Sequence, residues 1–311
     1  MGANLSRVYE GDDGRPPAGY PGLADIPENC IAGIFRHLSP LDICKLARLN
    51  RAFKGAASSD LVWAEKLPVC YQDMLSKLPL SKGQFLPKKE IYALLCKPIS
   101  LDNGTKEVWL DKATGGVCLA ISARAMAITG IDDHRYWRWI PCEESRFHEI
   151  AYLQQLWWFE VDGVVKFQLP AGEYSLSFRL RLGTSARRLG RRVQVFNQVH
   201  GWDLKPVQFC LSTSDGQHAT RGYYLDQAGE DGPVGDARGK WTDYHVGNFV
   251  VENENKLTEV KFSMTQIDCT HSKGGLSLDS VSIVPSKLQK ETEVCKYCVG
   301  FYTYLWKSFG I

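Results

Sequence analysis

Aromatic residues are concentrated in one short stretch of the sequence, DDHRYWRWI at positions 132–140. It contains Tyr136, Trp137 and Trp139, with Arg135 and Arg138 beside them. An indole ring can stack on the C–H face of a sugar while neighbouring polar groups bind hydroxyls, and it can equally fill a protein core. On a strand, Trp137 and Trp139 point to the same face. We predict that Trp139 is a core residue and that Trp137 lies either at the core edge or on a ligand platform.

Cysteine and histidine form two weaker patterns. Cys295 and Cys298 have the C-x-x-C spacing of half a zinc site, but the sequence has no second such pair and no histidine pair at a partnering distance. Cys269 and His271 are close in sequence and lack a third catalytic group. The sequence shows no glycine-rich phosphate loop, triad spacing or paired-carboxylate motif. We therefore expect neither a metal nor a cofactor, and we predict a binding protein rather than an enzyme.

Six arginines are clustered in RLRLGTSARRLGRR, positions 179–192. Such clusters bind phosphate groups or act as nuclear import signals. We favour the alternative, in which Arg179 and Arg181 lie on the solvated face of a strand and the other arginines lie in a charged loop. The net charge of +2 gives no general reason to expect a nucleic acid as a partner.

Length and composition indicate the number of domains and the class of protein that positions these residues. A chain of 311 residues, of which 44% are hydrophobic, is expected to fold into two globular domains. No apolar run is long enough to span a bilayer, so we expect no transmembrane segment. The ten cysteines, in a sequence without a secretory signal, are expected to be thiols. This predicts a location in the nucleus and the cytoplasm.

Residues 1–22 are rich in glycine, proline and charge, which predicts a disordered leader. Its first residues, MGANLS, fit the N-myristoylation pattern, with Gly2 as the acceptor after removal of Met1. A single acyl chain anchors a protein weakly and reversibly, so a myristoylated Gly2 predicts only weak membrane association. An unmodified Gly2 is the alternative that we favour.

Residues 23–68 have the periodicity of three short helices. Apolar residues recur at intervals of one, three and four between Cys30 and Leu38. Ser39 and Pro40 form a second helix start, with Ser39 as the N-cap. A third helical piece ends near Trp63. Helices this short cannot bury all of their apolar side chains, and the remainder indicates a docking face.

This segment resembles the F-box motif. The resemblance lies in DIPENCIAGIFRHLSPLDICKLARLNRAF and the later LVW, with Asn50 where serine is commoner. It implies docking to a Skp1-like protein and, through it, to the cullin of an SCF-type ubiquitin ligase. The side chains expected at the docking face are Ile26, Pro27, Ile31, Ile34, Phe35, Leu38, Leu41, Leu46 and Trp63.

Residues 69–105 are predicted to be a helical connector and residues 106–285 an antiparallel β-sandwich. The connector has a helical pattern from Lys88 to Cys96. KEVWL and GVCLAISA flank the turn DKATGG as in a hairpin, and YSLSFRLRL alternates apolar and polar residues. Many short strands without intervening long helices favour a jelly-roll-like sandwich. The fold class is therefore α+β, a three-helix domain followed by an all-β domain.

The β domain resembles the phloem protein 2 lectins of plants, the Nictaba type. AITGIDDHRYWRW, SRFHEIAYLQQLWWFEVDG, GEYSLSFRLRL, KWTDYHVGNFVV and VKFSMTQID carry the resemblance. It implies a lectin-type fold whose sugar site combines two tryptophans with two glutamates. Trp137 matches the second tryptophan and Gly130 replaces the first, while Lys261 and Gln266 replace the glutamates. Trp137 and Gln266 remain as candidates for binding a carbohydrate or a substrate.

The whole chain resembles the F-box proteins of the phloem protein 2 A group. This implies a non-catalytic substrate receptor of an SCF ligase that recruits a protein or glycoprotein through its lectin-like domain. The alternative is a lectin that binds glycans and has no ligase role. The aromatic tail, residues 286–311, is expected either to pack on the connector or the F-box or to bind a partner.

Overall fold

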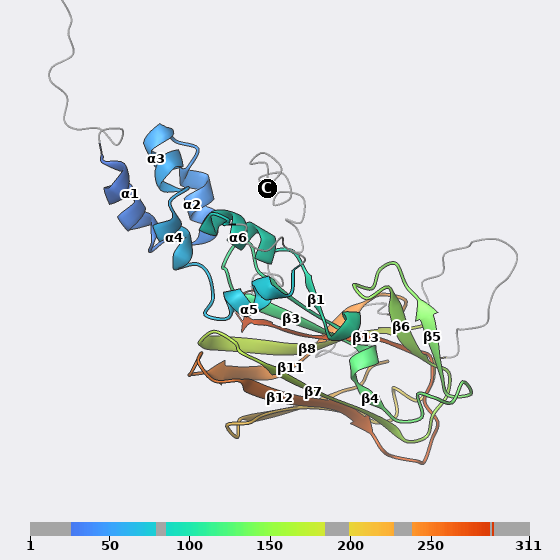
Figure 1. Cartoon of the computed structure of the whole chain (residues 1–311). Coiled ribbons are helices and arrows are strands. Elements are labelled where there is room, and N and C mark those ends of the chain that lie inside the picture. The colour runs from blue at the N-terminus through green and yellow to red at the C-terminus, as the bar shows by residue number, and fades with distance from the viewer. Residues whose placement is uncertain (1–25, 79–84, 184–198, 227–237, 287, 289–311) are drawn as a thin grey trace, which may run out of the picture.

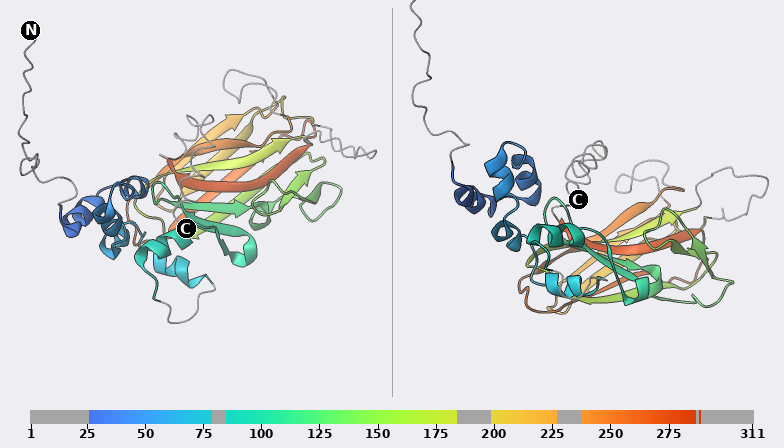
Figure 2. Two further views of the ribbon diagram at one scale, coloured as in Figure 1. Left: turned by 90° about the horizontal axis from the view of Figure 1, so that it is seen from above. Right: turned by 45° about the horizontal axis from the view of Figure 1, so that its top comes forward.

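Helices form the N-terminal part of the chain, and two β-sheets form the rest (Figure 1). The computed structural model describes residues 26–78, 85–183, 199–226, 238–286 and 288. The first four helices lie beyond one end of the sheets, and the views in Figure 2 show the same arrangement from two other directions. The expected order, a helical domain followed by an antiparallel sandwich, is confirmed.

The helical domain consists of α1 (Glu28–Phe35), α2 (Pro40–Leu46), α3 (Arg51–Ala56) and α4 (Asp60–Ala64). Ser39 caps α2 as predicted, since its Oγ accepts a hydrogen bond from the Asp42 N–H at 3.2 Å. Asn50 caps α3 in the same way, through an Oδ1 that accepts from Phe53 N–H at 2.8 Å. The third expected helix is in fact α3 and α4, because the chain turns at Ser58 and extended Ser59 starts a new helix.

The connector contains α5 (Tyr71–Ser76) and α6 (Lys88–Leu95), and the helix predicted at 88–96 is confirmed. Helix α6 contacts both domains, because its Tyr92 ring packs on Trp63 of α4 and its hydroxyl donates to the Asp111 carbonyl at 3.1 Å. Asp111 begins the turn between two strands of the sandwich. The helical domain is therefore packed onto the sheets through α6 and is not joined by a loop alone.

The larger sheet, sheet A, contains β1 (Ile99–Leu101), β2 (Lys106–Leu110), β3 (Val117–Ser122), β5 (Trp137–Pro141), β6 (Glu149–Leu153), β8 (Gly172–Leu182), β11 (Thr242–Val251) and β13 (Leu276–Pro285). Sheet B contains β4 (Ala127–Ile128), β7 (Phe159–Phe167), β9 (Val207–Thr213), β10 (His218–Tyr223) and β12 (Thr258–Gln266). Two short 3-10 turns, Asp102–Gly104 and Ala123–Ala125, lie beside β2 and β3.

All strand pairs between the named strands are antiparallel, and β13 pairs with β3, β6 and β8. The predicted hairpin is formed by β2 and β3. Sheet A begins at Ile99, inside the segment expected to be the connector. Residues 184–198, which follow β8, lie outside the described residues.

The core lies between the two sheets. The alternating residues of β8 that were expected to face inward are buried, and the Phe178 ring lies 5.3 Å from Phe209 and 5.8 Å from Phe262 of sheet B. On the outer face of β8, Arg179 and Arg181 are half-buried as the alternation indicates, whereas Ser175 and Ser177 are buried. The outer face of sheet A is thus only partly exposed to water.

Candidate functional site

The helical domain exposes several of the apolar side chains that were expected to dock a partner. Ile34 on α1 is 57% exposed, and Pro27 just before it is exposed as well. Ile26, Leu38, Leu41 and Leu46 are half-buried. We call these six side chains the docking face; Pro27 and Ile34 are exposed, and the other four are partly exposed while Ile26, Leu38 and Leu46 also pack against the core.

Three residues expected at the docking face are instead core residues of the helical domain, so their prediction as contact residues is corrected. Ile31, Phe35 and Trp63 are each 1% exposed. Phe35 packs edge-on against Phe53, with ring centroids 5.7 Å apart, and the Trp63 indole N–H donates to the Ala57 carbonyl at 2.7 Å. The motif spacing does not distinguish a residue that holds the helices together from one that contacts a partner.

The helical domain also exposes apolar residues that no sequence motif indicated. Leu49 lies just after α2 and Leu61 lies on α4, where it is 71% exposed. Val69, at the start of the connector, is half exposed. Exposed leucines on so small a domain mark an interaction surface. The surplus of apolar residues over what three short helices can bury was the available signal.

Trp137 belongs to the core, which contradicts its assignment as a ligand platform. Its side chain is 2% exposed, its ring stacks near Phe159 at 6.3 Å, and its indole N–H donates to the Thr129 carbonyl at 3.0 Å. Phe159 in turn meets Trp202 edge-on at 5.1 Å. Because the side chain is 2% exposed and its N–H is bonded inside the protein, Trp137 has no surface to offer a sugar.

Trp139 has the partly exposed position that was expected for Trp137. It follows on the same face of β5, as predicted, but it is only half-buried. The guanidinium of Arg124 lies 3.7 Å above its ring, and the same guanidinium binds Glu149 at 2.6 Å. Trp137 is therefore the more deeply buried of the two, whereas Trp139, which was predicted to be a core residue, is only partly buried and packs against the core.

Gln266 is likewise buried, at 4% exposure, so its expected contact with a carbohydrate is not available at the surface. It ends β12 directly opposite Phe159, the residue whose ring packs on Trp137. Its amide nitrogen donates to the Lys205 carbonyl at 2.5 Å. Its Oε1 has no hydrogen-bond partner among the described residues. The fold thus brings Trp137 and Gln266 into one region, but both side chains lie inside the protein.

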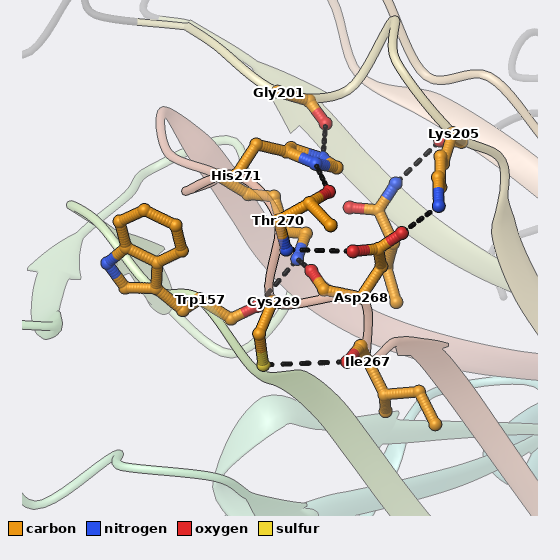
Figure 3. Close-up of polar contacts among 10 residues, drawn as sticks. Trp157, Gly201, Lys205, Ile267, Asp268, Cys269, Thr270 and His271 are labelled. Atoms are coloured by element: carbon orange, nitrogen blue, oxygen red, sulfur yellow. Dashed lines mark hydrogen bonds and ion pairs between the residues drawn. The ribbon is translucent and has the colours of Figure 1, made fainter.

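The loop that follows Gln266 is held by its own polar contacts (Figure 3). Asp268 forms an ion pair with Lys205, and His271 contacts the Gly201 carbonyl at 3.1 Å. Lys273 is fully buried, and its ammonium donates to the carbonyls of Trp157 and Asp268 at 2.5 and 2.6 Å. Burial lowers the pKa of Lys273. The ammonium satisfies two buried carbonyls, which is a structural role.

Neither Gly130 nor Lys261 supplies the group that the family's sugar site would have at its position. Gly130 has φ +75°, a conformation that favours glycine, and a Cβ there would lie 3.2 Å from the Tyr136 ring. Lys261 lies on the outer face of sheet B, with its ammonium 3.5 Å from Glu259. An aromatic residue at position 130 would therefore be strained, and residue 261 carries the opposite charge to the expected acid.

A cleft of about 470 Å³ lies on the outer face of sheet A, and the sequence analysis did not identify it. We call it the sheet A cleft. The loop between β5 and β6 forms one wall, Trp109 of β2 another, and Asp279 of β13 lies on the floor. Asp279 is 1% exposed, accepts from the Ser145 hydroxyl at 2.5 Å and lies 3.1 Å from the Arg179 guanidinium. Burial raises the pKa of Asp279, and the contacts with Ser145 and Arg179 oppose this shift.

Salt bridges fix the walls of the sheet A cleft. Arg181 and the Trp241 indole both donate to Glu144, at 3.0 and 2.8 Å. Arg146 stacks on Trp109 at 4.2 Å and binds Glu107. Arg179 and Arg181 are therefore bound to carboxylates, which does not support a phosphate-binding patch at these two residues. The other four arginines of that cluster lie outside the described residues.

Several further predictions concern metals, membranes and termini. Within the described ranges, no group of three or more His, Cys, Asp or Glu residues could hold a metal ion. No helix in that part of the chain is long and apolar enough to cross a membrane. Gly2, the leader 1–22 and the pair Cys295 and Cys298 lie outside the described residues, as does nearly all of the tail 286–311.

Comparison with known proteins supplies the context for this architecture. The F-box domain family matches residues 23–65, and the phloem protein 2 family matches residues 116–285. The Arabidopsis thaliana F-box protein PP2-A15 is 58% identical over 286 residues, covering 92% of this chain and 95% of the relative. F-box protein PP2-A12 from the same plant is 52% identical, covering 87% and 90%.

Solved structures resemble this chain only remotely. TmCBM61, solved with β-1,4-galactotriose, is 14% identical, covers 51% of this chain and 86% of its own, and has a TM-score of 0.28. The sequence comparisons are far closer and extend over both domains. With an F-box domain followed by a phloem protein 2 domain, this chain belongs to the F-box proteins of the PP2-A group.

Proposed function

We propose that this protein is the substrate-receptor subunit of an SCF-type ubiquitin ligase. The observation that carries the proposal is the docking face: apolar side chains such as Ile34 remain exposed in a helical domain that matches the F-box family. Exposed apolar surface of this kind is stabilised by burial against a partner. The partner is a Skp1-like protein, which connects the receptor to a cullin.

The phloem protein 2 domain then holds a protein or glycoprotein target. In this function the protein does no covalent chemistry itself. It raises the local concentration of target lysines near the charged ubiquitin-carrying enzyme, and such positioning alone can lower a reaction barrier substantially. The contact of α6 with both domains supports this function, because a target held by the sandwich then has a set direction relative to the docking face.

We further propose that this function is exercised in the nucleus and the cytoplasm. All eight cysteines in the described part of the chain are free thiols, which suits a reducing compartment. Myristoylation of Gly2 would add only weak membrane association.

The test is co-expression of the full chain with a Skp1-like protein, followed by affinity purification. The double variant Ile34→Asp, Leu49→Asp places two charges at exposed apolar positions and should abolish co-purification. The matched control is Leu257→Asp, the same change at an exposed leucine of the sandwich, which should leave co-purification unchanged. Undiminished binding by the double variant would refute the proposed docking.

The rival function, a lectin without a ligase role, makes the opposite predictions. It requires strong glycan binding that does not depend on the docking face. A glycan array probed with the full chain separates the two functions. Because Trp137 and Gln266 are buried, we expect weak or no binding to chitin oligomers.

A further inference from the structure

The sheet A cleft has more negative than positive charge. The carboxylates on its lining are Glu143, Glu144, Asp243 and Asp279, against the guanidinium groups of Arg146 and Arg179. Four negative and two positive charges leave a formal charge of −2 on the lining. Glu143, Glu144 and Asp243 are exposed and Asp279 is buried, so most of this charge faces water and is sensitive to salt.

The charges that remain unpaired are both carboxylates. Asp279 is bound by Arg179, and Glu144 is bound by Arg181 from outside the lining. Among the described residues, the side chains of Glu143 and Asp243 form no hydrogen bond or ion pair. Asp243 lies opposite Arg179 in the pairing of β11 with β8, and Arg179 acts on the Asp243 carboxylate as well as on Asp279, so one guanidinium serves two carboxylates.

An aromatic wall stands beside these carboxylates. Trp109 is half-buried and lines the cleft, with Arg146 stacked on its ring at 4.2 Å. The walls are rigid, because Ser145 is bound to the buried Asp279 and Glu144 to both Arg181 and Trp241. A rigid site loses little side-chain entropy when a ligand binds. An apolar stem along the indole and a cationic end at the carboxylates would complement this site.

We propose that the sheet A cleft binds a lysine or arginine side chain presented by a segment of a protein. A neutral sugar would leave Glu143 and Asp243 without a counter-charge, whereas a basic side chain supplies it. The proposal rests on the proposed function, because the segment would belong to the target that the receptor recruits. It assigns target recognition to the strands β2, β8, β11 and β13 and the β5–β6 loop, and not to Trp137 and Gln266.

The test is a fluorescence anisotropy titration of the full chain, co-purified with its Skp1-like partner, at low salt. The probe is a labelled Gly- and Ser-rich dodecapeptide with two arginines, and its matched control carries citrulline, which has the same shape without the charge. We expect the arginine peptide to bind up to about fivefold more tightly than the citrulline peptide, the upper range for an exposed ion pair. Binding should weaken as salt is raised.

Variants locate the binding in the cleft. Asp243→Asn and Glu143→Gln should each weaken binding of the arginine peptide by up to about fivefold, and Trp109→Ala should weaken binding of the same peptide. Glu252→Gln, the same change at an exposed carboxylate after β11, should have no effect. Equal affinity for the citrulline peptide, or no effect of the two cleft variants, would overturn the proposal.

Two competitor molecules test whether the cleft binds a different class of ligand. Displacement of the peptide by spermidine at the same concentration as by unlabelled peptide would assign the cleft to small amines and overturn the proposal. Displacement by a chitin oligomer would assign the cleft to sugars, with the same consequence. Co-purification of the Skp1-like protein in the same preparation shows separately whether the proposed function holds, so the two failures are distinguishable.

Discussion

The ring of Trp63 on α4 lies 5.0 Å from the ring of Tyr92 on α6, with the two planes inclined by 52°. Trp63 closes the F-box signature, and Tyr92 lies in the connector. Each side chain is 1% exposed, so the contact is part of a core shared by the F-box and the phloem protein 2 domain. The hydroxyl of Tyr92 extends this core to the turn after β2.

Tyr92→Phe should lower the free energy of unfolding by about 1 kcal/mol, because it removes the hydrogen bond to the Asp111 carbonyl and keeps the ring. Tyr92→Ala should cost about 3–5 kcal/mol, as for other large buried rings. Urea denaturation followed by tryptophan fluorescence measures both. Tyr224→Phe, at an exposed tyrosine, serves as the control and should stay within about 0.5 kcal/mol. A Tyr92→Ala variant as stable as wild type would disprove a shared core.

Trp137→Ala should destabilise the protein by about 3–5 kcal/mol, because it empties a site between Phe159 and the Thr129 carbonyl. Trp139→Ala should cost less, since the ring is only partly buried and its contact with Arg124 is worth about 0.5–1 kcal/mol at an exposed site. Thermal melts followed by circular dichroism compare the two variants directly. A larger loss for Trp139→Ala would contradict the positions described for the two rings.

Gly201→Ala should destabilise the protein by more than about 2 kcal/mol. Gly201 has φ +79°, and a Cβ would lie 2.2 Å from the backbone carbonyl of Ser272, so the backbone itself must shift. Gly216→Ala provides a matched control with φ +91° and open space around the position, and it should cost only about 1 kcal/mol. If urea denaturation gave the same loss of unfolding free energy for both variants, the close approach of residue 201 to the Ser272 carbonyl would have no effect.

Buried thiols should make the protein less stable at alkaline pH. Burial raises the pKa of Cys70 to about 11 and the pKa of Cys96 to about 12, against about 8.5 for a free thiol. A raised folded-state pKa gives a contribution that is complete below pH of about 8.5 and is lost as pH rises toward the folded value. Each thiol should therefore cost about 1.4 kcal/mol per pH unit in that window.

The measurement for the thiols is urea denaturation at pH 8 and pH 10. The free energy of unfolding of the wild type should fall more between these pH values than that of the double variant Cys70→Ala, Cys96→Ala. A Cys269→Ala variant, which removes an exposed thiol, should behave as wild type. Identical losses in all three proteins would mean that the two buried thiols do not contribute.

The sequence predicted the elements of this fold better than the environment of single residues. The alternation of β8 identified its buried face, and the serine before α2 identified a helix start, because both depend on neighbours in the chain. The burial of Trp137 and Trp139 depends instead on which residues pack against each ring, Phe159 on the first and Arg124 on the second. Those residues come from other strands and loops, and spacing within one strand cannot place them.

The sheet A cleft shows the same limit for binding sites. Arg179 meets Asp279 only because β8 and β13, about a hundred positions apart in the sequence, pair with a register shift near Asp279. Ser145 reaches the same carboxylate from the loop between β5 and β6. No motif joins these residues, so the sequence could indicate a polar strand face but not a cleft.

The contact of α6 with both domains has a consequence for any chimera built from this protein. A cut at the end of the F-box, near position 68, would divide the core that contains Trp63 and Tyr92 and leave each half with an exposed ring. The helices α4 and α6 and the turn after β2 must therefore be transferred together with the sandwich. In the proposed receptor function, this contact sets the orientation of the target as well as its affinity, and lengthening the chain next to α6 should retain the affinity while losing the orientation.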